Sequence, residues 1–264
     1  MPAARLLALG ILLLCGPASA ADGKCPAEVR VSFPNFEIAP YVLGSDKIES
    51  PPGSLVAWTR KALVRSGCAP VLTFKRRPPN RQLAELELGL LDILPGFSYS
   101  ARLAGQLAFP TRDGGPDLEL AVMSDFVSLY VRADDTAVRW DGKTLKSANP
   151  RVGTSTGGAA TSETLQAYGW QTETAVTPYA DLKKLIARRI DVIMEPDVVI
   201  GPYLMGADGA AVRKLAPPVR ATSRYAPVRK GFQEAYPEFT SRFWLELCRA
   251  ARENSPAAPA CRQP

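Results

Sequence analysis

The sequence of 264 residues contains no histidine. This absence excludes Ser-His-Asp and Cys-His catalysis, and it removes the side chain that most often binds transition metals in proteins. Cysteine is also scarce, because the chain has five, and their spacing matches no zinc motif. We therefore expect neither a metal site nor another cofactor.

Long apolar runs are absent after residue 20, so we expect no later segment to cross a membrane. The first twenty residues, MPAARLLALGILLLCGPASA, combine the basic Arg5 with an apolar run of roughly ten residues and a small-residue triplet, Ala18-Ser19-Ala20. This pattern predicts a cleavable secretory signal peptide over residues 1–20. A lipid anchor needs a small residue before its cysteine, whereas Cys15 follows a leucine. We therefore expect export to the periplasm without an anchor.

A strong charge of one sign is lacking as well. The chain carries 32 basic and 26 acidic residues, which gives a net charge of +6. The densest basic cluster, FKRRPPNR at residues 74–81, lacks the interleaved aromatic residues of a nucleic-acid platform. We expect a small-molecule ligand, no nucleic-acid partner, and a monomer.

Four cysteines remain after removal of the signal peptide: Cys25, Cys68, Cys248 and Cys261. An even number in an oxidising compartment predicts disulfides. Cys25 and Cys68 each precede a predicted strand, and the starts of parallel strands lie side by side, so we expect these two to pair. Cys248 and Cys261 then join the C-terminal tail to the last helix. Four cysteines allow three pairings, so the other two remain open at this stage.

Strands and helices alternate along the chain in two series. The first series has predicted strands at residues 28–36, 70–77 and 90–96, with helices at 54–67 and 80–89. The second has strands at 150–156, 172–177 and 190–196, with helices at 159–170 and 179–189. A β-rich passage at 118–134 leads into the second series, a return passage follows at 212–228, and an amphipathic helix at 238–254 closes the chain. We therefore predict two α/β lobes, with lobe 1 formed by residues 21–122 plus 223–264 and lobe 2 by residues 123–222.

Two passages carry a resemblance to a known family. They are LELGLLDILPGFSYSARLAGQLAFPT at residues 86–111 and YADLKKLIARRIDVIMEPD at residues 179–197. With the order of the elements, they resemble the periplasmic solute-binding proteins of polar amino-acid ABC importers, the type II or family 3 fold. The resemblance implies a two-lobe α/β protein in which each lobe is a mostly parallel sheet with flanking helices. It also implies a hinge near residues 123–127 and 222–227, and delivery of the ligand to a membrane permease.

The resemblance assigns the ligand's carboxylate to Arg102. A guanidinium forms two parallel charge-assisted bonds to a carboxylate, a fit that an ammonium does not reproduce. Gly96, Ser98 and Ser100 complete this cradle on lobe 1, where a polar turn follows a buried strand. Three aromatic residues are expected to form the walls around the ligand's side chain: Phe36, Tyr41 and Tyr99.

Lobe 2 is expected to contribute Ser155, Thr156 and Gly157, because a strand passes into a helix there and helix N-terminal amides bind anions. N-capping alone is the alternative use of this segment. The ligand's ammonium needs a carboxylate, and Glu195 and Asp197 are the candidates, since alternate residues of a strand share a face.

Two other functions are compatible with the sequence. One is a periplasmic enzyme of the same fold that resembles cyclohexadienyl dehydratases, with Glu195 as a general acid. The other is the ligand-sensing partner of a signalling receptor.

Overall fold

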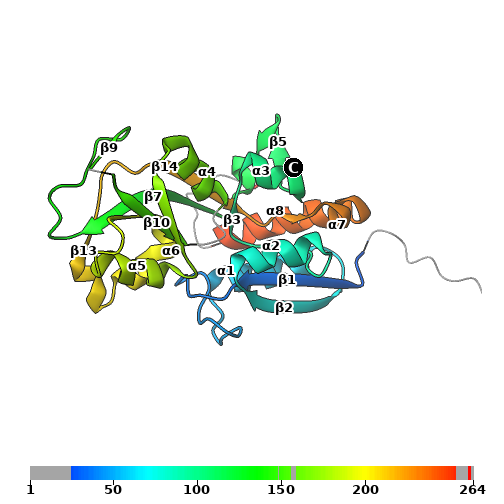
Figure 1. Cartoon of the computed structure of the whole chain (residues 1–264). Helices are drawn as coiled ribbons and strands as arrows, with labels where there is room; N and C mark the ends of the chain where they lie inside the picture. Colours follow the sequence, from blue (N-terminus) through cyan, green and yellow to red (C-terminus); the bar gives the residue numbers. More distant parts are fainter. Residues whose placement is uncertain (1–24, 148, 156–158, 254–260, 263–264) are drawn as a thin grey trace, which may run out of the picture.

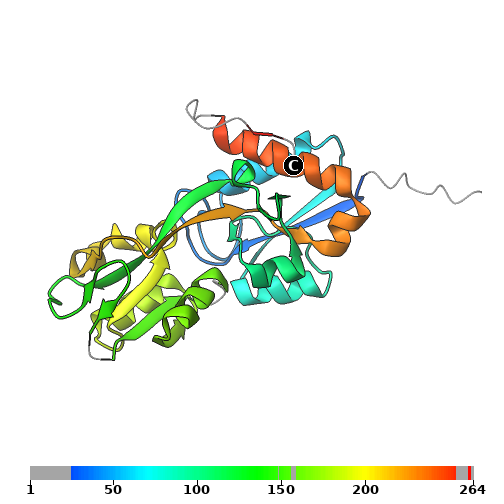
Figure 2. The same ribbon diagram turned by 90° about the horizontal axis from the view of Figure 1, so that it is seen from above.

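The computed structural model describes residues 25–147, 149–155, 159–253 and 261–262. The predicted signal peptide, residues 1–20, lies outside this range, as do Thr156 and Gly157. The described chain forms two lobes joined by two extended strands (Figures 1 and 2). Within the described residues, no helix has the length and apolar character needed to span a bilayer.

Lobe 1 is built from both ends of the chain. Its N-terminal part contains β1 (Glu28–Pro34), α1 (Ser54–Arg65), β2 (Val71–Arg77), α2 (Pro79–Glu87), β3 (Phe97–Ser98), α3 (Ala101–Gln106), β4 (Leu107–Ala108), β5 (Thr111–Arg112), β6 (Gly115–Pro116) and the 3-10 helix η1 (Leu118–Leu120). Its C-terminal part contains β15 (Val228–Arg229), α7 (Lys230–Ala235) and α8 (Pro237–Arg252). Strands β1 and β2 pair in parallel, as the first series of elements predicts.

The third strand predicted in lobe 1, residues 90–96, is shorter than expected. Ile93 makes single bridges, parallel to Val31 and antiparallel to Val228. Pro95 and Gly96 follow at once, and proline has no amide hydrogen to continue a ladder. This segment therefore joins β1 to β15 at one residue.

Lobe 2 has a parallel centre and antiparallel flanking strands. Its elements are β8 (Arg139–Trp140), β9 (Leu145–Lys146), β10 (Arg151–Ser155), α4 (Ala159–Tyr168), β11 (Gln171–Ala175), α5 (Pro178–Ile186), β12 (Val192–Pro196), α6 (Asp197–Leu204), the 3-10 helix η2 (Ala207–Ala211) and β13 (Val212–Lys214). Strand β10 pairs in parallel with β11 and with β12, whereas β12 and β13 pair antiparallel with β7.

The two lobes are connected by β7 (Met123–Arg132) and β14 (Arg220–Tyr225), which run side by side in opposite directions (Figure 2). Because β14 also pairs with β3, one sheet of order β11-β10-β12-β7-β14-β3 extends from lobe 2 into lobe 1. The predicted hinge segments lie in or beside these strands. The exact division of the chain at residues 122/123 and 222/223 stays a prediction.

The two lobes have separate hydrophobic cores. The larger core of lobe 1 packs β1 and α1 against the apolar face of α8, with Phe33, Leu63 and Phe243 at its centre. A core of lobe 2 packs around its sheet and includes Leu129 and Val192.

In each lobe an aspartate binds both the backbone amide and the side chain of an arginine near the start of a parallel strand, β1 in lobe 1 and β10 in lobe 2. In lobe 1, the Arg30 side chain forms two 2.9 Å bonds to the carboxylate of Asp92, whose Oδ2 also accepts from the Arg30 backbone amide at 3.0 Å. In lobe 2, Asp191 Oδ2 accepts from the Arg151 backbone amide at 3.0 Å and from its Nε at 3.3 Å. Asp191 and Asp92 thus both have a structural role.

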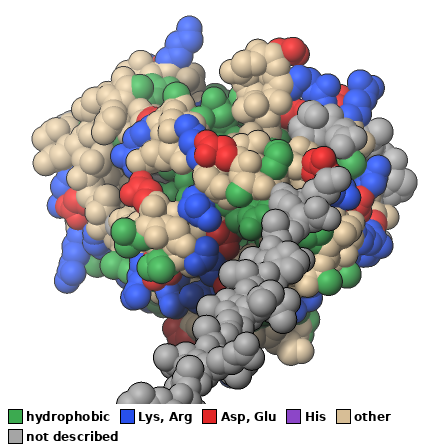
Figure 3. All heavy atoms as spheres, turned by 90° about the vertical axis from the view of Figure 1, so that its right-hand side faces the viewer, with side chains coloured by type: hydrophobic (Ala, Val, Ile, Leu, Met, Phe, Trp, Pro, Cys, Tyr) green, Lys and Arg blue, Asp and Glu red, His purple; other side chains and the backbone are tan. Residues whose placement is uncertain are grey.

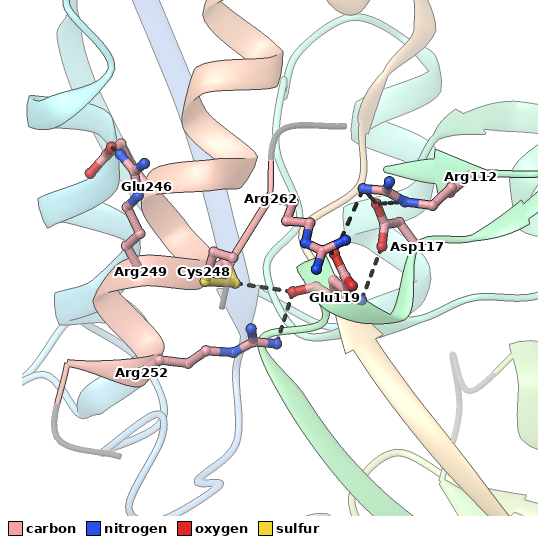
Figure 4. Close-up of a disulfide and its surroundings, with 9 residues drawn as sticks. Arg112, Asp117, Glu119, Glu246, Cys248, Arg249, Arg252 and Arg262 are labelled. Carbon is pink, nitrogen blue, oxygen red and sulfur yellow. Dashed lines mark hydrogen bonds and ion pairs between the residues drawn. A yellow bond between two sulfur atoms is a disulfide. The ribbon is translucent and has the colours of Figure 1, made fainter. Parts of the chain in front are cut away.

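The predicted disulfide pairing is confirmed, because Cys25 joins Cys68 and Cys248 joins Cys261. The second bond lies against the start of the connection to lobe 2 (Figure 4). There, the carbonyl oxygen of Glu119 in η1 contacts the Cys248 sulfur at 3.1 Å and accepts from Arg252 at 2.8 Å. The C-terminal end of the described chain is therefore held next to the segment that leads into β7.

Charged side chains of both signs are interspersed on the face of the molecule shown in Figure 3. This distribution agrees with the modest net charge. A nucleic-acid surface is expected to gather basic side chains into one continuous patch, and that face shows no such patch.

Candidate functional site

A cavity of about 100 Å³ lies between the lobes. One water needs about 10–15 Å³ of such volume, so several water-sized groups, or one small molecule, fit inside. Most lining residues are apolar: Pro34, Phe36, Ile38, Tyr41, Val42, Leu55, Pro79, Pro95, Phe97, Leu103, Met123, Pro196, Val198 and Val199. The polar lining side chains are Gln82, Ser98, Ser155, Thr161, Glu195 and Arg224. Mostly apolar walls with a few polar groups are typical of small-molecule sites.

The cation of the cavity is Arg224, on the connecting strand β14. Its side chain is largely buried, with 8% of the residue exposed, and burial lowers the pKa of its guanidinium. Nη1 donates to the carbonyl oxygen of Gly96 at 2.9 Å, while Nη2 lies 4.0 Å from Asp125 Oδ2. Nε has no hydrogen-bond partner among the described residues. Nε itself is buried from contact, so Arg224 is suited to attract an anionic group of a ligand through the part of its guanidinium that lines the cavity.

The carboxyl of the cavity is Glu195, at the end of β12 and 2% exposed. Its Oε1 accepts from the Ser155 backbone amide and, at 3.3 Å, from the Thr154 hydroxyl. Burial raises the pKa of Glu195, and these hydrogen bonds oppose the rise. Glu195 therefore joins two neighbouring strands of lobe 2 while presenting part of its surface to the cavity.

Asp125, on the connecting strand β7, holds this strand against α6 of lobe 2. Its Oδ2 accepts from the Val198 amide at the start of α6 at 3.1 Å, and its Oδ1 accepts from the Phe126 amide at 2.8 Å. Burial raises the pKa of Asp125 despite these bonds. Besides these two amides, its Oδ2 lies 4.0 Å from Arg224 Nη2, a distance longer than a hydrogen bond.

Six of the predicted site residues line the cavity: Phe36, Tyr41, Gly96, Ser98, Ser155 and Glu195. Tyr41 also packs edge-on against Trp58 at 6.0 Å between ring centroids. Thr156 and Gly157 lie outside the described residues.

Three predicted residues of the polar turn lie elsewhere. Arg102 is exposed on α3, and the next residue, Leu103, lines the cavity instead. Successive helix residues are rotated by 100°, which turns Arg102 away from the space that Leu103 faces. Ser100 caps α3 by accepting from the Leu103 amide at 3.2 Å, and Tyr99 packs edge-on against Phe109 at 5.3 Å.

Asp197 does not share the environment of Glu195. We expected strand alternation to place both on one face, but β12 ends at Pro196 and α6 begins at Asp197. The Asp197 carboxylate accepts from the Tyr130 hydroxyl at 2.6 Å and pairs with Lys214. It therefore belongs to a polar cluster of lobe 2 and is absent from the cavity wall.

Arg224 was not among the predicted site residues, although among the described residues it is the arginine that lines the cavity. The signal was present in RATSRY, where Thr222 and Arg224 alternate along a strand of the predicted hinge. The Thr222 hydroxyl donates to the Ser98 hydroxyl at 3.1 Å, so this face of β14 meets the predicted polar turn. Among the described residues, no cluster of His, Cys, Asp or Glu has a metal-binding arrangement.

Comparison with known proteins adds to this geometry. No family model matches the sequence, and no curated protein matches it significantly. An ancestral arginine-binding protein bound to arginine is similar in structure, with a TM-score of 0.63 and 14% identity over 87% of this chain and 98% of its own. The substrate-binding protein AbpA of an amino-acid ABC transporter from Streptococcus pneumoniae, bound to L-arginine, has a TM-score of 0.65 and 14% identity over 86% of this chain and 94% of its own. A histidine kinase sensor domain with similarity to periplasmic binding proteins has a TM-score of 0.61 and 18% identity over 89% of this chain and 98% of its own.

The protein has the type II periplasmic-binding-protein fold. These comparisons confirm the predicted fold class, in which a ligand cavity lies between two α/β lobes. The similar proteins are described as binding or sensor proteins rather than enzymes. At identities of 14–18% they establish a shared periplasmic-binding-protein architecture, and function has to be argued from the cavity itself.

Proposed function

We propose that this periplasmic-binding-protein-fold chain is an extracytoplasmic solute-binding protein. It captures a small carboxylate-bearing ligand, an amino acid or a related acid, between its lobes. It then delivers the ligand to the permease of an ABC importer. The observation that carries the proposal is the guanidinium of Arg224, which lines a largely apolar cavity between the lobes. Such a donor matches a carboxylate.

The position of Arg224 explains how binding would favour closure. Arg224 lies on a connecting strand, Phe36 and Leu55 belong to lobe 1, and Ser155 and Val198 belong to lobe 2. A ligand in the cavity touches both lobes, so it binds the closed arrangement more tightly than an open one. Rotation about β7 and β14 is the expected hinge motion.

Thermal unfolding with candidate ligands tests the proposal. We expect amino acids or related carboxylic acids to stabilise the wild-type protein, by about 2.7 kcal/mol at 100 times the dissociation constant. Arg224→Gln should abolish this stabilisation. Arg102→Gln, which changes an exposed arginine of the neighbouring helix, is the matched control and should retain it. Equal stabilisation of wild type and Arg224→Gln would contradict the role of Arg224, and the absence of any stabilising carboxylate would contradict the function.

A ligand-sensing partner of a signalling receptor is the second candidate, and the similarity to a histidine kinase sensor domain favours it. Both candidates need the same capture step and differ in the partner that recognises the closed form. Reconstitution with the permease in liposomes distinguishes them, because uptake should then require this protein.

An enzyme is distinguished from both candidates by the fate of the ligand. Burial raises the pKa of Glu195, as a general acid requires. A binding protein releases its ligand unchanged, whereas a dehydratase of this fold releases a product. Mass spectrometry of the released ligand therefore separates the two.

A further inference from the structure

The apolar walls of the cavity come from both lobes. Phe36, Ile38 and Leu55 line it from lobe 1, while Val198 and Val199 line it from lobe 2. Among the described lining residues, Arg224 and Glu195 are the charged side chains. A ligand of this size therefore meets hydrocarbon over most of its surface, and a second charged group on it would be buried against apolar walls.

Glu195 is already used within lobe 2. Its Oε1 receives both the Ser155 amide and the Thr154 hydroxyl, and the residue is 2% exposed. Burial raises its pKa and so disfavours its ionised form. Through Oε1 this carboxyl holds β10 against β12, and at 2% exposure the residue presents little surface to the cation of a ligand.

The guanidinium of Arg224 has no carboxylate within hydrogen-bond distance among the described residues. The nearest carboxylate, that of Asp125, is 4.0 Å from Nη2 and accepts backbone hydrogen bonds from Val198 and Phe126. Among the described residues that line the cavity, Arg224 is 8% exposed and Glu195 is 2% exposed, so the guanidinium presents more surface to a ligand than the carboxyl does.

From this asymmetry we propose that the ligand is a monocarboxylic acid with an apolar body and no cationic group. The inference rests on the proposed capture function and narrows its ligand class. The carboxylate of the ligand binds Arg224, and its hydrocarbon body fills the space between Phe36, Leu55 and Val199.

Calorimetric titration with matched pairs tests this inference. The pairs are leucine with 4-methylpentanoate and phenylalanine with 3-phenylpropanoate, and arginine and glutamate serve as polar comparisons. We expect each ammonium-free acid to bind at least tenfold more tightly than its amino-acid counterpart, and arginine and glutamate to bind at least tenfold more weakly than the best acid. In Glu195→Gln, the ratio of affinities within each pair should stay within about threefold of the wild-type ratio.

Three results would overturn the inference while leaving carboxylate capture intact. These are tighter binding of the amino acid in each pair, tightest binding of arginine or glutamate, or a change of more than about threefold in the affinity ratio within the pairs in Glu195→Gln. A ratio that moves further toward the ammonium-free acid would show that Glu195 binds the ammonium. Failure of every carboxylate to bind, or equal binding by Arg224→Gln, would instead overturn the capture function itself.

Discussion

The hydroxyl of Tyr203, in α6 of lobe 2, donates to the carbonyl oxygen of Glu37, in the loop after β1 of lobe 1, at 3.0 Å. Arg76 holds this loop in place, because its buried guanidinium donates to the carbonyl oxygens of Pro34, Phe36 and Gly44. Tyr203 thus contacts a well-fixed part of the opposite lobe, and its hydrogen bond joins the two lobes directly.

Tyr203→Phe should weaken ligand binding without changing the walls of the cavity. The loss of one hydrogen bond of about 0.5–1.5 kcal/mol from the closed form corresponds to roughly two- to tenfold lower affinity. Tyr179→Phe is the matched control, because the Tyr179 hydroxyl donates to Asp208 within lobe 2. Titration calorimetry of both variants checks this, and an equal effect in the two would show that Tyr203 does not act between the lobes.

Asp181→Asn should remove a pH dependence of stability. Asp181, in α5, is fully buried against Gly153, and neither carboxyl oxygen has a hydrogen-bond partner among the described residues. Burial, assisted by the nearby Glu195, raises its pKa from 3.8 to about 8. Between these values the folded state holds a proton that the unfolded state has lost, so stability falls as pH rises from about 4 to about 8.

Asp181 should lower the unfolding free energy by at most about 1.4 kcal/mol for each pH unit in this range. Asp181→Asn should lack this decrease and should therefore gain stability relative to wild type as pH rises toward 8. Urea unfolding at several pH values measures the difference. Parallel wild-type and mutant curves would mean that Asp181 ionises in the fold as it does in the unfolded chain.

The equivalent aspartates of the two lobes should differ in their contribution to stability. The Asp92 side chain is 2% exposed and that of Asp191 is 27% exposed. Breaking a buried ion pair costs more than breaking a partly solvated one, so Asp92→Asn should lower the unfolding free energy by about 3 kcal/mol and Asp191→Asn by about 1 kcal/mol. Denaturant unfolding tests the order, which would be wrong if both cost the same.

Each disulfide should stabilise the folded protein by an amount that grows with the length of the loop it closes. Cys25 and Cys68 are 43 residues apart, and Cys248 and Cys261 are 13 apart. The chain-entropy relation gives a loss of about 4 kcal/mol for the double serine variant of the first pair and about 3 kcal/mol for the second. Urea unfolding of each variant measures both values. A larger loss from the second pair would point to native contacts, such as those around Glu119, rather than to chain entropy.

The fold was largely predictable because its signals are local. Alternation in EVRVSF and helical spacing in SLVAWTRKALVR mark elements that the structure contains as β1 and α1. The cysteine pairing followed from the parallel order of β1 and β2. The strand expected at residues 90–96 was shortened by the Pro95-Gly96 break, whose effect on pairing depends on distant partners.

The site was less predictable because it depends on the rotation of single residues. Arg102 and Leu103 are neighbours, and one step of helix rotation separates an exposed arginine from a leucine in the cavity. Asp197 was misplaced because the change from strand to helix falls between it and Glu195. The alternation in RATSRY places Thr222 and Arg224 on one face of a strand, but which face meets the cavity depends on how β14 pairs with β3 and β7.

The chain leaves lobe 1 along β7 and returns along β14, and Asp125 lies opposite Thr222 in that pair. Neighbouring strands are about 4.8 Å apart, so the two ends of the whole second lobe are separated by little more than one residue's length. Topologically, lobe 2 is an insertion into a host domain. A short turn that joins Asp125 to Thr222 could replace it, which makes this crossing the natural place to graft a reporter domain onto the protein.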